Sequence, residues 1–209
     1  MLLFSRVVTL TGNPREAVPW AIGINEYVNA NSDLDVSLWS CNFGYPIGTV
    51  AWSTVVESQV ALADGTAKLL VDDGYFDQIE NGREFAAQPG QDFLRELVHG
   101  EPGDPPPIGA VATITTATAL VDRMADAVGW GVEIARYVTA ATGAPVSVLT
   151  NVYGQMGEIT WVGVQPDLDA AEAVRLKLNS DMEYLGRMAA TKELYVPASG
   201  HVANVTRIG

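Results

Sequence analysis

The side chains best suited to bind or transform a small molecule lie at alternating positions in two related stretches of the chain. Trp39, Cys41 and Phe43 occupy such positions in the first stretch, and Asn151 and Tyr153 occupy matching positions 110 residues later. Alternate residues of a β-strand point to the same side, so each set is expected to share one face. Mixed aromatic and small polar groups are typical of a small-molecule cavity. We therefore expect these five residues to line a ligand-binding site, with Tyr153 as its best hydrogen-bond donor.

A core packed with side chains would show the same pattern, and the sequence leaves this alternative open. Cys41 is either a small buried apolar side chain or a reactive thiol. Arg6 and Arg95 lie on predicted strands. They either extend into solvent or hold an anionic ligand at the mouth of a cavity.

A second group of polar residues occurs twice. Lys68, Asp72 and Tyr75 recur 109 positions later as the same three residue types. The spacing i, i+4, i+7 predicts that all three share one face of a helix, where they could exchange protons. Because a catalytic site seldom needs to be duplicated, the recurrence favours an architectural role, such as a contact between helices.

The sequence contains none of the common motifs for metal binding, phosphate binding or nucleophilic catalysis. CxxC and HxxxH pairs are absent, as are GxSxG, GxGxxG and the phosphate loop. A single cysteine excludes an intrachain disulfide, and the two histidines are His99 and His201. We therefore predict no metal site.

The second half of the chain repeats the pattern of the first half. Trp20, Ile24 and Tyr27 reappear 110 positions later as residues of the same type, and Trp52 reappears as Trp161 after one residue is dropped. A repeat of this length is a whole folding unit rather than one turn of a solenoid. Matching positions are expected to build the fold, and the positions that differ are where one half could have acquired a function.

Both halves read as strand, helix, a hairpin of two strands, helix and strand. Glycines flank residues 44–48 and 154–157, which indicates the turns of two hairpins. Asn13 and Pro14 predict a helix start, and Pro19 is expected to kink that helix or delay its start. The predicted strands are 5–11, 36–43, 49–55, 91–98, 146–153, 158–164 and 201–208, and the predicted second helices are 58–82 and 167–190.

The order β-α-β-β-α-β is that of a ferredoxin-like unit, an α+β fold. We expect one repeat in residues 1–99, a stiff connection rich in proline and glycine in residues 100–109, and a second repeat in residues 110–209. Strand 36–43 is apolar on both sides, so its sheet needs a cover on each face. The helices of each repeat cover one face, and the sheet of the other repeat is expected to cover the second.

This pattern resembles the dimeric α/β-barrel superfamily, in the form where two ferredoxin-like repeats are fused in one chain as a pseudo-two-fold barrel. The resemblance implies a small, mostly apolar or aromatic ligand inside the barrel. It also makes haem the first cofactor to consider, because two-repeat members carry an axial histidine on a helix of the second repeat. Here neither histidine lies on a predicted helix, so no cofactor is predicted and haem stays an alternative.

Composition excludes some partners. The chain has 209 residues, 48% of them hydrophobic and 18% charged, with a formal net charge of −13. A surface this acidic argues against nucleic acid or an anionic membrane as a partner. The short apolar start of the chain has no basic segment and is read as a strand, so we expect a cytoplasmic protein. Homo-oligomers are an open possibility.

Two functions from different classes follow from these observations. The first is a barrel that binds a small apolar or aromatic molecule, either as a binding protein or as an enzyme that resembles a cofactor-independent monooxygenase or isomerase. The second is a non-catalytic structural or interaction protein whose barrel is filled with side chains. An open lumen between the sheets would favour the first function, and a packed lumen would favour the second.

Overall fold

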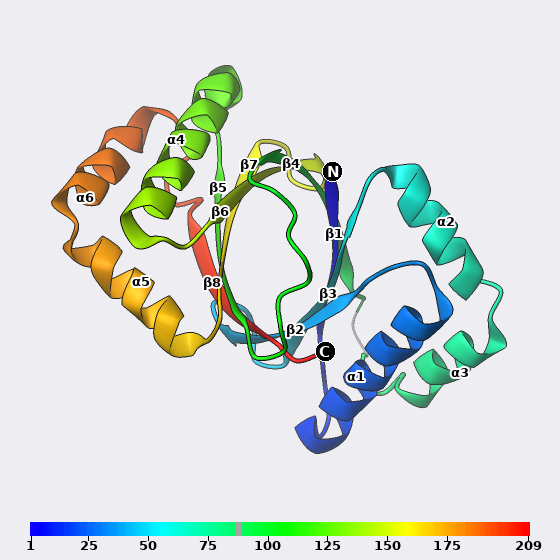
Figure 1. Ribbon diagram of the computed structural model, residues 1–209. Coiled ribbons are helices and arrows are strands. Elements are labelled where there is room, and N and C mark those ends of the chain that lie inside the picture. Colours follow the sequence, from blue (N-terminus) through cyan, green and yellow to red (C-terminus); the bar gives the residue numbers. More distant parts are fainter. Residues whose placement is uncertain (87–88) are drawn as a thin grey trace.

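The computed structural model describes residues 1–86 and 89–209, and within them eight strands close into one antiparallel barrel. Two groups of helices flank the barrel on opposite sides (Figure 1). The strands are β1 (Leu2–Thr9), β2 (Ser37–Phe43), β3 (Thr49–Val56), β4 (Gln91–His99), β5 (Val111–Thr118), β6 (Val146–Tyr153), β7 (Glu158–Gln165) and β8 (His201–Arg207). The helices are α1 (Pro14–Asn31), α2 (Gln59–Leu69), α3 (Asp73–Asn81), α4 (Met124–Thr142), α5 (Leu168–Ser180) and α6 (Met182–Ala189), with short 3-10 turns η1 (Val121–Arg123) and η2 (Ala190–Glu193).

The barrel joins two sheets of the same topology edge to edge. The strand order is β1-β3-β2-β8-β5-β7-β6-β4, closed by pairing of β4 with β1. Each repeat thus contributes four neighbouring strands, and the ladders β2–β8 and β4–β6 connect the repeats. The prediction of two ferredoxin-like repeats that form a pseudo-two-fold α/β barrel is confirmed.

Helix α1 starts where the sequence predicted. The side chain of Asn13 accepts a hydrogen bond from the backbone amide of Arg15, and Pro14 occupies the first turn, where a missing amide costs nothing. The helix continues through Pro19 to Asn31. Pro19 therefore does not delay the helix start.

The predicted helices 58–82 and 167–190 are each divided in two, which corrects the sequence prediction. The first helix of the first pair, α2, ends at Leu69, and Asp72 then caps α3, since its carboxylate accepts hydrogen bonds from the amides of Gly74 and Tyr75. Asp181 caps α6 in the same way. An aspartate that bonds to amides two and three residues ahead holds an extended backbone, which interrupts a helix. The repeated Lys, Asp and Tyr residues therefore do not share one helical face.

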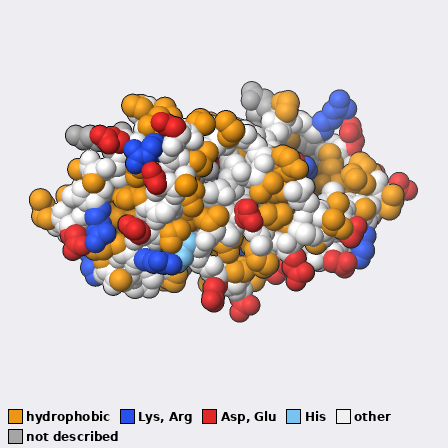
Figure 2. Space-filling model, turned by 90° about the horizontal axis from the view of Figure 1, so that it is seen from above, with side chains coloured by type: hydrophobic (Ala, Val, Ile, Leu, Met, Phe, Trp, Pro, Cys, Tyr) orange, Lys and Arg blue, Asp and Glu red, His pale blue; other side chains and the backbone are white. Residues whose placement is uncertain are grey.

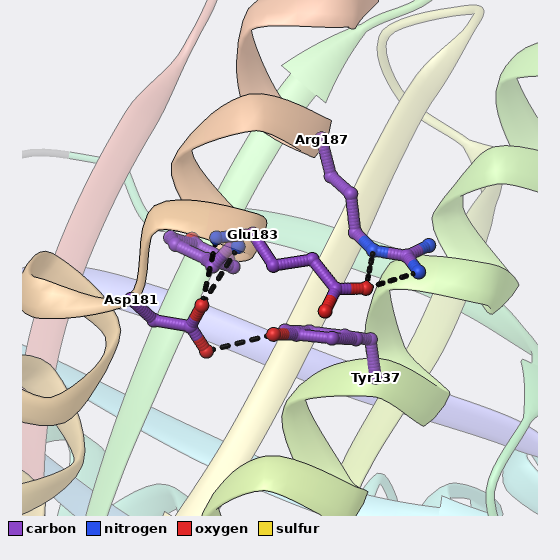
Figure 3. A network of polar contacts seen from close by, with 5 residues as sticks. Tyr137, Asp181, Glu183 and Arg187 are labelled. Atoms are coloured by element: carbon purple, nitrogen blue, oxygen red, sulfur yellow. Dashed lines mark hydrogen bonds and ion pairs between the residues drawn. The ribbon is translucent and has the colours of Figure 1, made fainter.

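The repeated aspartates instead connect helices within each repeat. The Tyr27 hydroxyl donates to Asp72 at 2.9 Å, and the Tyr137 hydroxyl donates to Asp181 at 2.8 Å. The bond to Asp181, together with burial, raises the pKa of Tyr137 to about 12. Arg187 lies over the Tyr137 ring at 4.6 Å and is itself paired with Glu183 (Figure 3). These contacts support the architectural role that the repetition suggested.

Repeated tryptophans anchor the helices to the outside of the barrel. Trp20 of α1 meets Trp52 of β3 edge to face at 6.5 Å, and Trp130 meets Trp161 at 6.1 Å in the second repeat. Such aromatic pairs stabilise a core beyond their buried area. The matched tryptophans therefore build the core of each helical layer.

The chain has a formal net charge of −13. Figure 2 shows Asp and Glu side chains distributed along the molecule, with hydrophobic side chains between them. Within residues 1–86 and 89–209, no helix has the length and apolar character needed to cross a membrane.

Replacing Asp181 by Asn should lower the melting temperature, because Tyr137 and the amides at the start of α6 would lose an ionic acceptor. The amide of Tyr184 first, and then the Tyr137 hydroxyl, hold the pKa of Asp181 below its ordinary value of 3.8. A carboxyl group of this kind stabilises the fold above its unfolded-state pKa, and that contribution is lost as the pH falls through the folded-state pKa. The wild type should therefore exceed Asp181→Asn in melting temperature near neutral pH, and the difference should shrink below about pH 4.

Circular dichroism melts from pH 7 to pH 3 provide the measurement. Glu172→Gln is the control, because Glu172 is an exposed partner of Arg175 on the neighbouring helix α5. A melting-temperature difference for Asp181→Asn that is unchanged in acid would contradict this role.

Candidate functional site

The barrel lumen is open. It contains a cavity of about 680 Å³, lined by inward-facing residues of all the barrel strands and by part of the connection between the repeats. The interior therefore has room for a small organic molecule, within the 300–1,000 Å³ typical of ligand sites. A lumen filled with side chains would not contain a cavity of this size.

One wall of the cavity carries a row of hydroxyl groups. Ser53 of β3 is the register partner of Ser5 on β1 and of Ser37 on β2, and all three line the cavity. Trp39 lies next to this row, and its indole nitrogen donates to the Ser53 hydroxyl at 2.9 Å. The opposite wall is apolar. It is formed by Ala112, Ile114, Val162 and Val205.

Trp39 and Cys41 line the cavity as predicted from strand alternation. The Cys41 thiol lies 3.3 Å from the backbone carbonyl of Phe43, to which it donates. The side chain is half-buried and beside apolar residues. Whether either residue contacts a ligand stays a prediction.

Phe43 and Tyr153 lie outside the cavity, which corrects the expectation from alternation. Phe43 is 68% exposed and Tyr153 is 61% exposed. The register shifts between Cys41 and Phe43 in β2, and opposite Leu94 and Arg95 in β6. A bulge of this kind reverses the alternation of the residues that follow. The Tyr153 hydroxyl accordingly lies on the outer side, 3.3 Å from Oε1 of Gln59.

The two arginines that were candidates for binding an anion lie in different places. Arg6 lies on the outside of β1, where its guanidinium makes two 2.8 Å bonds to Asp92. The Arg6 side chain is 49% exposed, so Arg6 and Asp92 form an ion pair on the surface. Arg95 instead lines the cavity, and its side chain is only 11% exposed.

Arg95 belongs to a buried polar cluster at one end of the lumen. Its guanidinium lies 3.4 Å from Glu158, whose side chain is 15% exposed. Asn151, the fifth residue predicted at the site, donates its amide to the same Glu158 oxygen at 3.2 Å. The ring of Phe93 lies 4.4 Å below the Arg95 guanidinium, in a cation–π contact. Asn151 does not itself line the cavity, contrary to the expectation from alternation, and contacts the site only through Glu158.

Tyr45 covers this end of the cavity. It lies in the hairpin turn between β2 and β3, and Gly44 before it has φ 97°, with no room for a Cβ against the backbone of Val202 and Ala203. The turn thereby directs the Tyr45 side chain over the lumen, where it lines the cavity. Burial is the main cause that raises the pKa of Tyr45, and Arg95 partly opposes the rise. The phenol is therefore protonated at neutral pH and acts as a hydrogen-bond donor.

The connection between the repeats covers the other end. Residues 101–106 line the cavity, and in Figure 1 this segment passes across the space between the two halves of the barrel. The Arg207 guanidinium donates to the carbonyl of Pro106, and the amide of Gly109 donates to the carbonyl of Arg207 at 2.9 Å. We call this end the linker rim, and the end with the turns at residues 44–48 and 154–157 the hairpin rim.

Tyr45 and Glu158 are functional candidates that were not predicted from the sequence. Both sit where the repeats differ, since Gln155 matches Tyr45 and Thr49 matches Glu158. From sequence alone, an aromatic residue in a hairpin turn is predicted to be exposed to solvent, unless the turn is known to fold over the cavity. The mismatch between the repeats was the available signal.

Neither histidine is placed as an axial haem ligand within the lumen. His99 ends β4 and His201 begins β8, so both lie on strands at the rims. The Nε2 atom of His201 is 2.7 Å from the carbonyl oxygen of Gly44, and its ring packs 5.1 Å from that of Tyr45. The described residues of the lumen therefore do not fit a haem group.

Solved structures with the same fold have very different sequences. A candidate monooxygenase from Fusobacterium nucleatum subsp. nucleatum ATCC 25586 superposes with a TM-score of 0.70 at 11% identity, over 100% of this chain and 92% of that chain. An anthrone oxidase-like protein gives the same TM-score and identity, over 100% of this chain and 91% of that chain. A major regulator of staphylococcal pathogenesis gives a TM-score of 0.57 at 10% identity, over 100% of both chains. No protein-family model and no curated protein matches the sequence.

Replacing Ser53 by Ala should destabilise the protein by about 1–3 kcal/mol, because the indole of Trp39 would keep a buried donor without an acceptor. Trp39 is only 9% exposed, and the Ser53 hydroxyl accepts the hydrogen bond of its indole. Urea unfolding gives the free energy of unfolding. Ser5→Ala on the same hydroxyl row is the matched control, and equal losses for the two variants would contradict the role of Ser53.

Proposed function

We propose that this protein, which has the fold of the dimeric α/β-barrel superfamily in its fused two-repeat form, binds one small apolar or aromatic molecule inside the barrel. The observation that carries the proposal is the cavity of about 680 Å³ between a hydroxyl-bearing wall and an apolar wall. A flat ring fits against Trp39, and polar substituents meet the serine row. The bound molecule is largely removed from water.

We further propose that the bound molecule is transformed without a cofactor, by oxygenation or isomerisation. In such an oxygenation an activated CH₂ group loses two C–H bonds and gains one C=O bond, and the second oxygen atom of O₂ leaves as water. The substrate supplies all the electrons, so no reductant is required. The names of the monooxygenase-like neighbours favour this reaction, although at 11% identity their likeness extends only to the fold.

The chain's own residues would contribute orientation and hydrogen bonding. Tyr45, protonated at neutral pH, is the donor best placed to stabilise negative charge that develops on a substrate oxygen. Trp39 and the apolar wall position the ring. The turn above Tyr45 and the connection at the linker rim restrict the access of water, which strengthens these interactions.

A non-catalytic role is the second candidate, because a protein described as a regulator has the same fold. The open lumen would then hold a signal molecule that is bound without being changed. The two candidates differ in turnover and agree on the ligand site.

Filling the lumen should abolish binding. Ala51 faces the cavity beside Trp39, so Ala51→Phe places a ring in the ligand space. Quenching of tryptophan fluorescence by 2-naphthol should show at least about tenfold weaker binding for this variant, since the buried apolar area of the ligand is lost. Val60→Phe adds the same ring on the exposed face of α2 and should leave binding unchanged.

Oxygen uptake separates an enzyme from a binding protein. With anthrone as the test substrate, the wild type should consume O₂ faster than the uncatalysed background, and Tyr45→Phe should be slower by about tenfold or more, because removing one oxyanion donor costs at least this much. Binding of 2-naphthol without oxygen uptake from any aromatic tested would support the non-catalytic candidate. Equal binding by Ala51→Phe and the wild type would contradict a ligand site in the lumen.

A further inference from the structure

The polar cluster at the hairpin rim occurs once in a barrel that is otherwise duplicated. The position that matches Arg95 in the second repeat is Val205, and the position that matches Asn151 is Cys41. Glu158 is matched by Thr49. The pseudo-two-fold axis therefore relates a charged group of residues on β4, β6 and β7 to an uncharged group on β8, β2 and β3.

Arg95 has unused hydrogen-bonding capacity. Its contact with Glu158 is long, at 3.4 Å, whereas charge-assisted bonds are usually 2.7–2.9 Å. The ring of Phe93 contacts the face of the guanidinium and uses none of its N–H groups. Among the described residues, Nε of Arg95 and Oδ1 of Asn151 are buried and have no hydrogen-bond partner. Arg95 lines the cavity, and its single long contact with Glu158 leaves N–H groups of the guanidinium available to an acceptor on a ligand.

Charge differs between the two ends of the cavity. Asp35, Glu101 and Asp104 line it at the linker rim, and Arg95 lines it towards the hairpin rim. An anionic group is repelled at the first end. At the second end it meets Arg95, because the Glu158 carboxylate that faces the guanidinium does not itself line the cavity. A ligand with one acidic oxygen would consequently have a single favourable orientation.

We propose that Arg95 binds an acidic oxygen of the ligand, a carboxylate or an ionised phenol or enol, and so fixes which end of the ligand lies under Tyr45. Glu158 and Asn151 are positioning residues: Glu158 holds the guanidinium and Asn151 holds Glu158. The apolar part of the ligand lies against Val205 and Ile114 and extends towards the linker rim. This inference rests on the proposed function, because it places the ligand in the same lumen.

Isothermal titration calorimetry with three probes that share one ring system tests the proposal. The probes are 2-naphthoate, 2-naphthol and the neutral 2-naphthamide. The wild type should bind 2-naphthoate, or 2-naphthol above the pH at which its hydroxyl ionises, at least about tenfold more tightly than 2-naphthamide, since a hydrogen bond between charged partners is the stronger one. Which of the two acidic probes is preferred distinguishes a carboxylate ligand from a phenol or enol.

The preference should require Arg95. Arg95→Met should remove it, and Arg6→Met, the same substitution on the outer side of neighbouring β1, should retain it. Glu158→Gln should increase it, because Arg95 would lose its competing carboxylate. Since Arg95→Met leaves Glu158 without its partner, the double variant Arg95→Met/Glu158→Gln removes both charges and should also lack the preference.

The possible results separate this inference from the proposed function. Equal affinities for the three probes, or a preference that survives in both variants lacking Arg95, would overturn the role of Arg95 while the lumen site stands. Failure of all three probes to bind the wild type would overturn the lumen site itself.

Discussion

Hydrogen bonding between β2 and β8, and between β4 and β6, holds the two repeats together, and both the closed barrel and its cavity require it. These two ladders join the repeats into a closed barrel, so neither sheet has a free edge. Closure also fixes the distance between the two walls of the lumen. Since each ladder contains one strand from each repeat, neither half could form this cavity alone.

Side-chain size decides whether such a barrel is filled or open. A small barrel is just wide enough to be packed by its own side chains or to hold one ligand. Here small residues such as Ser37, Ala51, Ser53 and Ser147 face inward and leave the space between the walls free. The large tryptophans of the repeat, Trp52 and Trp161, face outward into the helical layers. The distribution of large and small residues over the two faces therefore produces both the core and the cavity.

The fold could be predicted from the sequence because the repeat supplies two consistent copies of one pattern. The site could be predicted only in part, because it depends on local departures from regular geometry. The register shift after Cys41 places Phe43 outside, and the turn at Gly44 places Tyr45 inside. The alternation of inward and outward residues along a strand predicts neither the register shift nor the direction of the turn. The split of the second helices likewise depends on aspartates that bond to the backbone, which a helical spacing rule does not detect.

We propose one orientation for one ligand in the lumen, with its acidic end at Arg95. A crystal structure with 6-bromo-2-naphthoate tests it most directly, because anomalous scattering locates the bromine atom without reference to the rest of the ligand. We expect one bromine peak inside the barrel, near residues 102–106, with the carboxylate at Arg95. A peak at the Arg95 end, two peaks of similar height, or a peak outside the barrel would contradict it.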